Sequence, residues 1–91
     1  MRNIKWLKRA LHDMNRIALY IALDNKDRAV SFVHEIFDQV DDLRLFPYLG
    51  RSGKKDNIRE LVIRKHYLVS YRMREDTIEI LQVWHTAKDR S

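Results

Sequence analysis

Hydrophobic positions in the first half of the chain recur at steps of three and four residues. The first series is Leu7, Ala10, Leu11, Met14, Ile17, Ala18 and Ile21. This spacing is typical of a helix of about four or five turns with one apolar face, and it leaves Lys8, Arg9, Asp13 and Arg16 off that face. After a break and cap at Asp24-Asn25, a second series continues to Phe46. Its members are Ala29, Val30, Val33, Ile36, Phe37, Val40 and Leu43. The short connection predicts an antiparallel helix hairpin.

The period of the pattern shortens to two in the second half of the chain. Pro47, Gly50 and Gly53 interrupt the helical pattern, and alternation then runs through residues 58–63, 67–74 and 77–85. Glu75-Asp76 has the length of a two-residue hairpin turn. We expect Tyr67 and Tyr71, on one face of a strand, to pack in the core rather than to stack on nucleic-acid bases.

A short strand over residues 3–6 completes the expected order of elements. The sequence therefore predicts one α+β domain over residues 1–91, with a helix hairpin packed on a small antiparallel sheet in the order β-α-α-β-β-β.

The composition excludes several classes of protein. The 91 residues include no cysteine, so disulfide frameworks, thiolate zinc sites and cysteine nucleophiles are ruled out, and a reducing cytoplasm suits the chain. The apolar runs are far shorter than the roughly 20 residues that span a bilayer, and the first residues do not have the pattern of a signal peptide. We expect a cytoplasmic protein without a membrane partner.

The net charge of +5 is concentrated in the second half of the chain. Residues 1–45 carry 8 Lys and Arg against 7 Asp and Glu, whereas residues 46–91 carry 10 against 6. A basic surface on the sheet attracts a nucleic acid or an acidic protein through the same Coulomb interaction, and composition does not separate these partners. It is also compatible with the ordinary solvated face of a small domain.

Histidine is the remaining residue type with chemistry to offer. The spacing of the four histidines predicts no metal site, and no motif predicts a cofactor. His85 follows Trp84 at the end of the last expected strand, with Lys88 and Arg90 close behind. An imidazole beside fixed cations can move a proton and stabilise the charge that develops when RNA is cleaved. The alternative is a structural histidine at a strand end.

Motifs from one end of the chain to the other resemble the RelE/ParE superfamily of toxins from type II toxin–antitoxin modules. The motifs are Ile4-Lys5-Trp6-Leu7, Ala10-Leu11-His12-Asp13, Tyr20-Ile21-Ala22, Phe46-Pro47-Tyr48-Leu49-Gly50-Arg51, Ile58-Arg59-Glu60-Leu61-Val62, Tyr67-Leu68-Val69-Ser70-Tyr71-Arg72 and residues 78–85. The resemblance rests on the order of all these motifs together. The family's fold has the same order of elements, β-α-α-β-β-β, as expected above.

The resemblance implies a cytoplasmic toxin that arrests growth until a cognate acidic antitoxin neutralises it. In this family the antitoxin wraps the helix hairpin and the sheet, so we expect Arg72 and Arg74 to contact it. Operator DNA would be bound indirectly, through the antitoxin.

The target of the toxin divides the superfamily. RelE-like toxins are endoribonucleases that cut mRNA on the ribosome, whereas ParE-like toxins inhibit DNA gyrase and are not enzymes. Leu68 stands where the nucleases usually carry an arginine, and no tyrosine follows Tyr71, although Arg59 and His85 fall near basic and catalytic positions of nucleases. We therefore expect a ParE-like gyrase inhibitor.

Each possible function implies its own functional residues. For gyrase, the expected target contacts are Arg51, Arg59, Lys88 and Arg90. For a RelE-like nuclease, His85 and Arg59 would be catalytic. A third reading is an inactive toxin fold that acts only in a repressor complex with the antitoxin and DNA.

Overall fold

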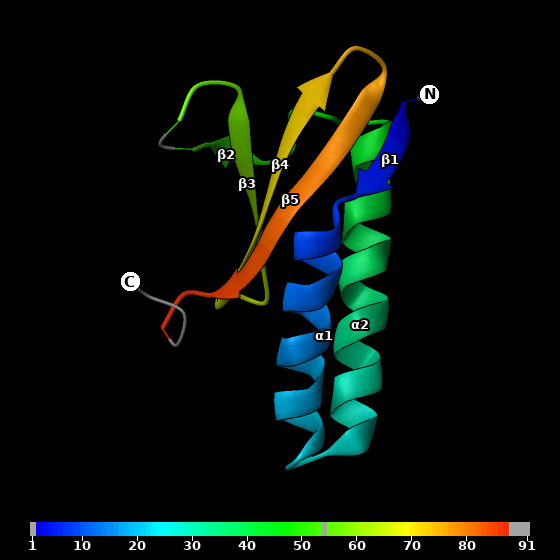
Figure 1. Ribbon diagram of the computed structural model, residues 1–91, viewed down its shortest axis with the longest axis vertical. Coiled ribbons are helices and arrows are strands. Elements are labelled where there is room, and N and C mark those ends of the chain that lie inside the picture. Colours follow the sequence, from blue (N-terminus) through cyan, green and yellow to red (C-terminus); the bar gives the residue numbers. More distant parts are fainter. Residues whose placement is uncertain (1, 54, 88–91) are drawn as a thin grey trace.

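A computed structural model describes residues 2–53 and 55–87 of the protein. The elements are β1 (Asn3–Trp6), α1 (Lys8–Ala22), α2 (Lys26–Asp41), a 3₁₀ turn η1 (Asp42–Arg44), β2 (Arg51–Ser52), β3 (Ile58–Ile63), β4 (Tyr67–Arg74) and β5 (Thr77–His85). The two helices lie side by side as an antiparallel hairpin against one part of a twisted sheet (Figure 1). The α+β class and the predicted order of the main elements are confirmed.

The sheet differs from the expectation in two respects. Its strand order is β1-β5-β4-β3-β2, and β1 pairs with β5 in parallel, so the sheet is mixed rather than wholly antiparallel. The short β2, within the segment predicted as a connection, adds an edge strand beside β3. The parallel pairing could not be predicted from hydrophobic period, because it joins strands at opposite ends of the chain, and the two residues of β2 are too few to show a period.

The helices are placed by local signals and by burial. The Asn25 side chain accepts a hydrogen bond from the Arg28 amide at 3.0 Å, which confirms the predicted cap between the helices. The second helix ends at Asp41, and Phe46, expected on its apolar face, is instead exposed in the following loop. Fully buried side chains from both layers, among them Phe32, Ile36 and Val69, form the core between the hairpin and the sheet.

Asp13 in α1 also differs from the expectation. It was expected off the apolar face, but it is buried and its Oδ2 accepts a hydrogen bond from the Val83 amide at 3.1 Å. The ladder between β1 and β5 ends at Trp6 and Ile80, so the carboxylate satisfies a strand amide beyond the end of that ladder. Arg9 Nε lies 3.7 Å from the same carboxylate.

The turn between β4 and β5 lies at the predicted Glu75-Asp76, with Glu75 at a φ of 58°. Further along this pair the register shifts, since Ser70 faces Gln82 while Tyr71 faces Ile80. Tyr71 is fully buried and Tyr67 packs against the core, which confirms the expectation for both rings.

Candidate functional site

The loop between η1 and β2 is anchored by the hydroxyl of Tyr71. That hydroxyl donates a hydrogen bond to the Pro47 carbonyl at 2.8 Å and accepts one from the Gly50 amide at 2.9 Å. Burial raises the pKa of Tyr71 above its ordinary value, while the bond from Gly50 and the charge of Arg59 act in the opposite direction. The neutral hydroxyl is therefore the form that holds the loop at neutral pH.

Gly50 allows the loop to approach β4 this closely. A Cβ at this position would lie 2.8 Å from both Cε1 and the hydroxyl oxygen of Tyr71, and 2.9 Å from the Glu60 carbonyl oxygen. These contacts are too short for any side chain, so the close approach of backbone to ring requires glycine.

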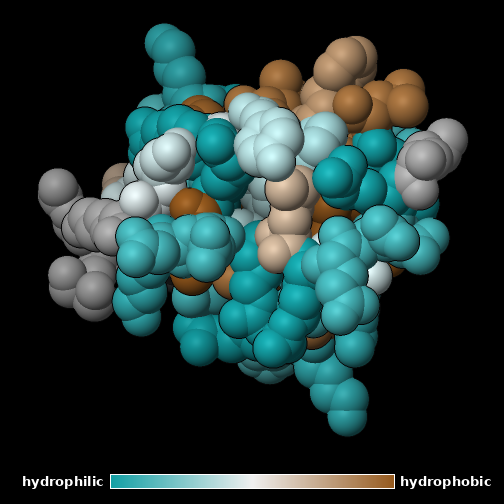
Figure 2. All heavy atoms as spheres, turned by 90° about the horizontal axis from the view of Figure 1, so that it is seen from above, coloured by the Kyte–Doolittle hydropathy of each residue, from teal (hydrophilic) through white to brown (hydrophobic). Residues whose placement is uncertain are grey.

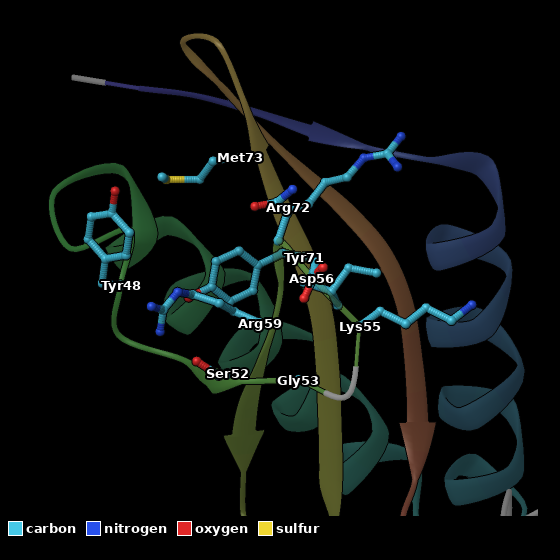
Figure 3. A pocket seen from close by; sticks show the side chains of 11 residues that line it. Tyr48, Ser52, Gly53, Lys55, Asp56, Arg59, Tyr71, Arg72 and Met73 are labelled. Atoms are coloured by element: carbon cyan, nitrogen blue, oxygen red, sulfur yellow. The ribbon is translucent and has the colours of Figure 1, made fainter.

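Arg59 provides the second anchor of the loop. From β3, its Nη1 donates to the Gly50 carbonyl at 2.6 Å, and its guanidinium carbon lies 4.9 Å from the centre of the Tyr48 ring. Figure 3 shows the side chains of Arg59 and Tyr71 reaching toward the segment that carries Tyr48. Arg59, predicted as a target contact or a catalytic group, is thus partly buried and bonded to the loop.

The anchored loop exposes several large apolar side chains, which we call the apolar loop. The fractions exposed are Leu45 66%, Phe46 62%, Tyr48 62% and Leu49 54%, whereas Pro47 between them is buried. Figure 2 looks onto the end of the molecule that carries η1 and shows hydrophobic side chains gathered along one margin of a mostly hydrophilic face. Such a cluster is typical of an interaction surface.

A polar pocket of about 360 Å³ lies beside the apolar loop. Its lining includes Tyr48, Lys55, Asp56, Arg59 and Arg72. Arg51, at the same edge, is exposed and its Nε lies 3.4 Å from Glu60 Oε1. The structure therefore gathers three of the predicted cations, Arg51, Arg59 and Arg72, on the side of the sheet formed by β2, β3 and β4.

Arg72 and Arg74, the predicted antitoxin contacts, lie on β4 near Glu79. Arg72 Nε donates to Glu79 Oε1 at 2.6 Å, and this hydrogen bond is the main reason why the pKa of Glu79 is lowered. The charge of Arg74 lowers it further. Lys88 and Arg90, predicted as target contacts, lie outside the described residues.

His85 lies at the end of β5, away from Arg59 along the sheet. Its ring stacks on His66 with centroids 5.8 Å apart and meets Tyr67 edge-on at 4.9 Å, while its Nδ1 accepts a hydrogen bond from the Ala87 amide at 3.1 Å. His85 pairs with Tyr67 and Arg59 with Tyr71, which are four residues apart on β4. That spacing corresponds to about 13 Å, so the two predicted catalytic residues are not brought together.

A second pocket, of about 460 Å³, lies between the hairpin and this end of the sheet. It was not predicted, because its lining comes from α1, α2, the β3–β4 turn and two strands. The lining includes Arg16, Tyr20, Arg28, Arg64, Tyr67 and His85. Arg64 is held there by Glu35 at 2.5 Å and by the Ser31 hydroxyl at 3.1 Å.

The outer surface of the hairpin forms a shallow apolar groove, which we call the hairpin groove. Small side chains on both helices leave room for a cavity of about 440 Å³. Its lining is Ala18, Leu19, Ala22, Lys26, Ala29, Val30, Val33 and His34. Leu19 and Val30 are 62% and 57% exposed, so this groove is a second apolar surface open to a partner.

The described residues offer no metal centre and no membrane span. Among residues 2–53 and 55–87, no three His, Cys, Asp or Glu side chains gather in a group that could hold a metal ion. Within the same part of the chain, no helix combines the length and apolarity needed to cross a bilayer.

Comparison with known proteins identifies the class as a toxin of a type II toxin–antitoxin system. Residues 4–90 match the family described as ParE toxin of the type II toxin–antitoxin system parDE, and the chain belongs to this family. The family implies an antitoxin partner.

The relatives agree with this assignment. The chain is 39% identical to the toxin Y4kP of Sinorhizobium fredii over 85 residues, which is 92% of this chain and 88% of that protein. It is 27% identical to the toxin RelE2 of Caulobacter vibrioides over 88 residues, covering 97% of this chain and 99% of the other.

Two solved structures share the fold. A chain of the chromosomal ParDE system of P. aeruginosa superposes with a TM-score of 0.82 at 25% identity, covering 93% of this chain and 96% of the other. A copper-bound mutant toxin from Helicobacter pylori superposes with a TM-score of 0.68 at 17% identity, covering 98% and 99%. The second likeness concerns the fold only.

Proposed function

We propose that this ParE-family toxin arrests growth by inhibiting DNA gyrase. The observation that carries the proposal is the separation of Arg59 from His85 by about 13 Å along the sheet. A ribonuclease of this fold needs an acid or base and a cation around one phosphate, within hydrogen-bond reach of it. Arg59 is instead engaged by the Gly50 carbonyl, and the His85 ring stacks on His66.

Inhibition of gyrase requires only a binding surface, and the described residues form two exposed apolar surfaces. The apolar loop and the hairpin groove both expose side chains of the kind that bind other proteins. If the apolar loop binds the target and the hairpin groove binds the antitoxin, both surfaces have a function and no catalytic group is needed.

The experiment measures two activities of the purified toxin in parallel. We expect it to inhibit supercoiling by purified DNA gyrase and to leave translated message intact. An unaffected gyrase would contradict the proposal. The second candidate is a ribosome-dependent nuclease, which the name of the relative RelE2 suggests. Cuts in the message at defined codon positions that vanish in His85→Ala and Arg59→Ala would establish that function instead. If induction without antitoxin leaves growth unchanged, the protein acts only in a repressor complex.

We further propose that an acidic antitoxin neutralises the toxin by covering the hairpin groove and the basic face of β4. Arg72 and Arg74 would meet its carboxylates, and the groove would take its apolar side chains. Replacing Arg74 by Glu should weaken antitoxin binding and flatten the dependence of the affinity on salt, because a favourable charge contact becomes a repulsive one. Unchanged affinity and salt dependence would remove Arg74 from the interface.

A further inference from the structure

The backbone of the apolar loop is fixed before any partner binds. The amides of Leu45 and Phe46 donate to the Asp42 carbonyl at 3.2 and 3.0 Å, and the Leu49 amide donates to the Phe46 carbonyl at 3.1 Å. Gly50 is held at its amide by Tyr71 and at its carbonyl by Arg59. The side chains therefore stand exposed on a loop that has little conformational freedom left to lose on binding.

The side chains on this loop are of the types that contribute most to protein interfaces. Phe46 and Tyr48 are aromatic and more than half exposed, and leucines lie on either side of them. Aromatic residues with a rigid backbone supply large contact area at low entropic cost. Tyr48 is further held by the cation–π contact with Arg59.

The charges beside the loop are mainly positive. Arg51, Lys55 and Arg59 lie at the edge of the sheet next to it, against Asp56 and Glu60. Together with the apolar side chains, this edge is complementary to a protein surface that has an apolar depression with carboxylates on its rim.

The loop and the hairpin groove lie far apart. Figure 1 shows the tip of the hairpin at one end of the longest axis and η1 and β2 toward the other. The molecule measures 39 Å along that axis. Different partners can therefore use the two surfaces. Arg72 lines the pocket beside the loop, so an antitoxin bound at Arg72 would hinder a second protein docked on the loop.

We propose that the apolar loop is the surface by which this toxin binds its protein target, and that Arg59 and Tyr71 are positioning residues that hold the loop in its binding conformation. The inference rests on the proposed function in taking gyrase as that target. It changes the role expected for Arg59, from a group that contacts the target to one that acts through Gly50 and Tyr48.

The test compares the affinities of the full-length toxin for two purified partners, DNA gyrase and the antitoxin encoded beside it. The double variant Leu45→Gln/Phe46→Gln changes only exposed side chains and should weaken gyrase binding about 30-fold, because it removes central apolar anchors. Its affinity for the antitoxin should stay within about twofold, as expected for a contact that lies outside that interface. Leu11→Gln on α1, where the side chain is 41% exposed and outside both surfaces, is the matched control and should leave both affinities unchanged.

The positioning role has a readout of its own. Arg59→Ala should weaken gyrase binding about tenfold without weakening antitoxin binding, and Arg59→Lys should restore part of the loss, because an ammonium can still donate to the Gly50 carbonyl. A general loss of folding would lower both affinities together and would be visible in the circular dichroism spectrum.

Each outcome decides a different point. If the wild-type toxin neither binds nor inhibits gyrase, the proposed function and this inference both fail. If the wild type binds gyrase and the double variant binds equally well, only the inference fails. A double variant that loses antitoxin affinity instead would assign the apolar loop to the antitoxin and would also overturn it.

Discussion

The two apolar surfaces of this toxin are built in different ways. The hairpin groove lies on two helices whose backbone hydrogen bonds are local, and the Asn25 cap between them is local as well. The apolar loop has no regular structure of its own, and side chains from β3 and β4 hold it in place. The hairpin groove should therefore keep its shape when residues elsewhere in the molecule are changed. The apolar loop, in contrast, can be displaced by substitutions in β3 or β4 that leave its own residues unchanged.

The largest effect is expected from closing the space at Gly50. Gly50→Val would place side-chain atoms against the buried Tyr71 ring, so the loop must move or the ring must shift. We expect a loss of about 2 to 3 kcal/mol in the free energy of unfolding, measured by urea denaturation. Leu49→Val, at the exposed neighbouring position, is the control and should change stability by less than about 0.5 kcal/mol. Equal stability of the two variants would show that the loop does not depend on this close approach.

Removing one oxygen atom from the anchor should have the next largest effect. Tyr71→Phe leaves the Gly50 amide and the Pro47 carbonyl without their partner, at a cost of about 2 kcal/mol. Amide exchange of Gly50 should accelerate more than that of Ile36 in α2, because the hairpin does not use this hydroxyl. Tyr48→Phe is the matched control on an exposed ring. If both amides accelerate equally, the loop and the hairpin open as one unit and the loop is not held independently of the hairpin.

A substitution in the hairpin groove should weaken binding of the antitoxin. Leu19→Gln replaces an exposed side chain of the groove by one with similar helix propensity, so we expect the fold to persist and the antitoxin affinity to fall about tenfold. Calorimetric titration with the antitoxin measures the change, and Leu11→Gln on the same helix serves as control. An unchanged affinity for Leu19→Gln would place the antitoxin elsewhere.

The smallest effect concerns the pH at which the loop is released. The pKa of Tyr71 is raised in the folded protein, so its contribution to stability is fully present below its ordinary pKa and is lost as the pH rises above about 10. Absorbance of tyrosinate should therefore show a step above about pH 10 that Tyr71→Phe removes. If Tyr71→Phe removes no step above about pH 10, the hydroxyl of Tyr71 is not protected by burial.

Local patterns predicted the helices, the cap and the hairpin turn because each depends on residues close in sequence. Asn25 caps a helix through an amide three residues away, and Glu75-Asp76 reverses the chain within two residues. The expectations that failed depended on distant contacts. Asp13 is buried because a strand amide 70 residues later needs an acceptor, and Phe46 leaves the helical face because the helix ends first.

The candidate sites divide along the same line. The family and the basic residues of the second half of the chain could be identified from the sequence, because both depend only on residue types and their order. It did not show that Arg59 would be bonded to Gly50, nor that His85 would stack on His66 far from Arg59. Those relations depend on strand register, which places residues that are distant in sequence opposite each other.

Hydrophobic period and residue order were thus sufficient for the class of fold, the helix hairpin, the basic half and the toxin family, since each is a property of neighbouring residues or of their sequence. The parallel pairing of β1, the buried carboxylate of Asp13 and the anchored apolar loop were decided only by the tertiary structure. A hydrogen bond between segments 20 or more residues apart forms only after the core has brought them together, and no local pattern encodes which partner each polar group will meet.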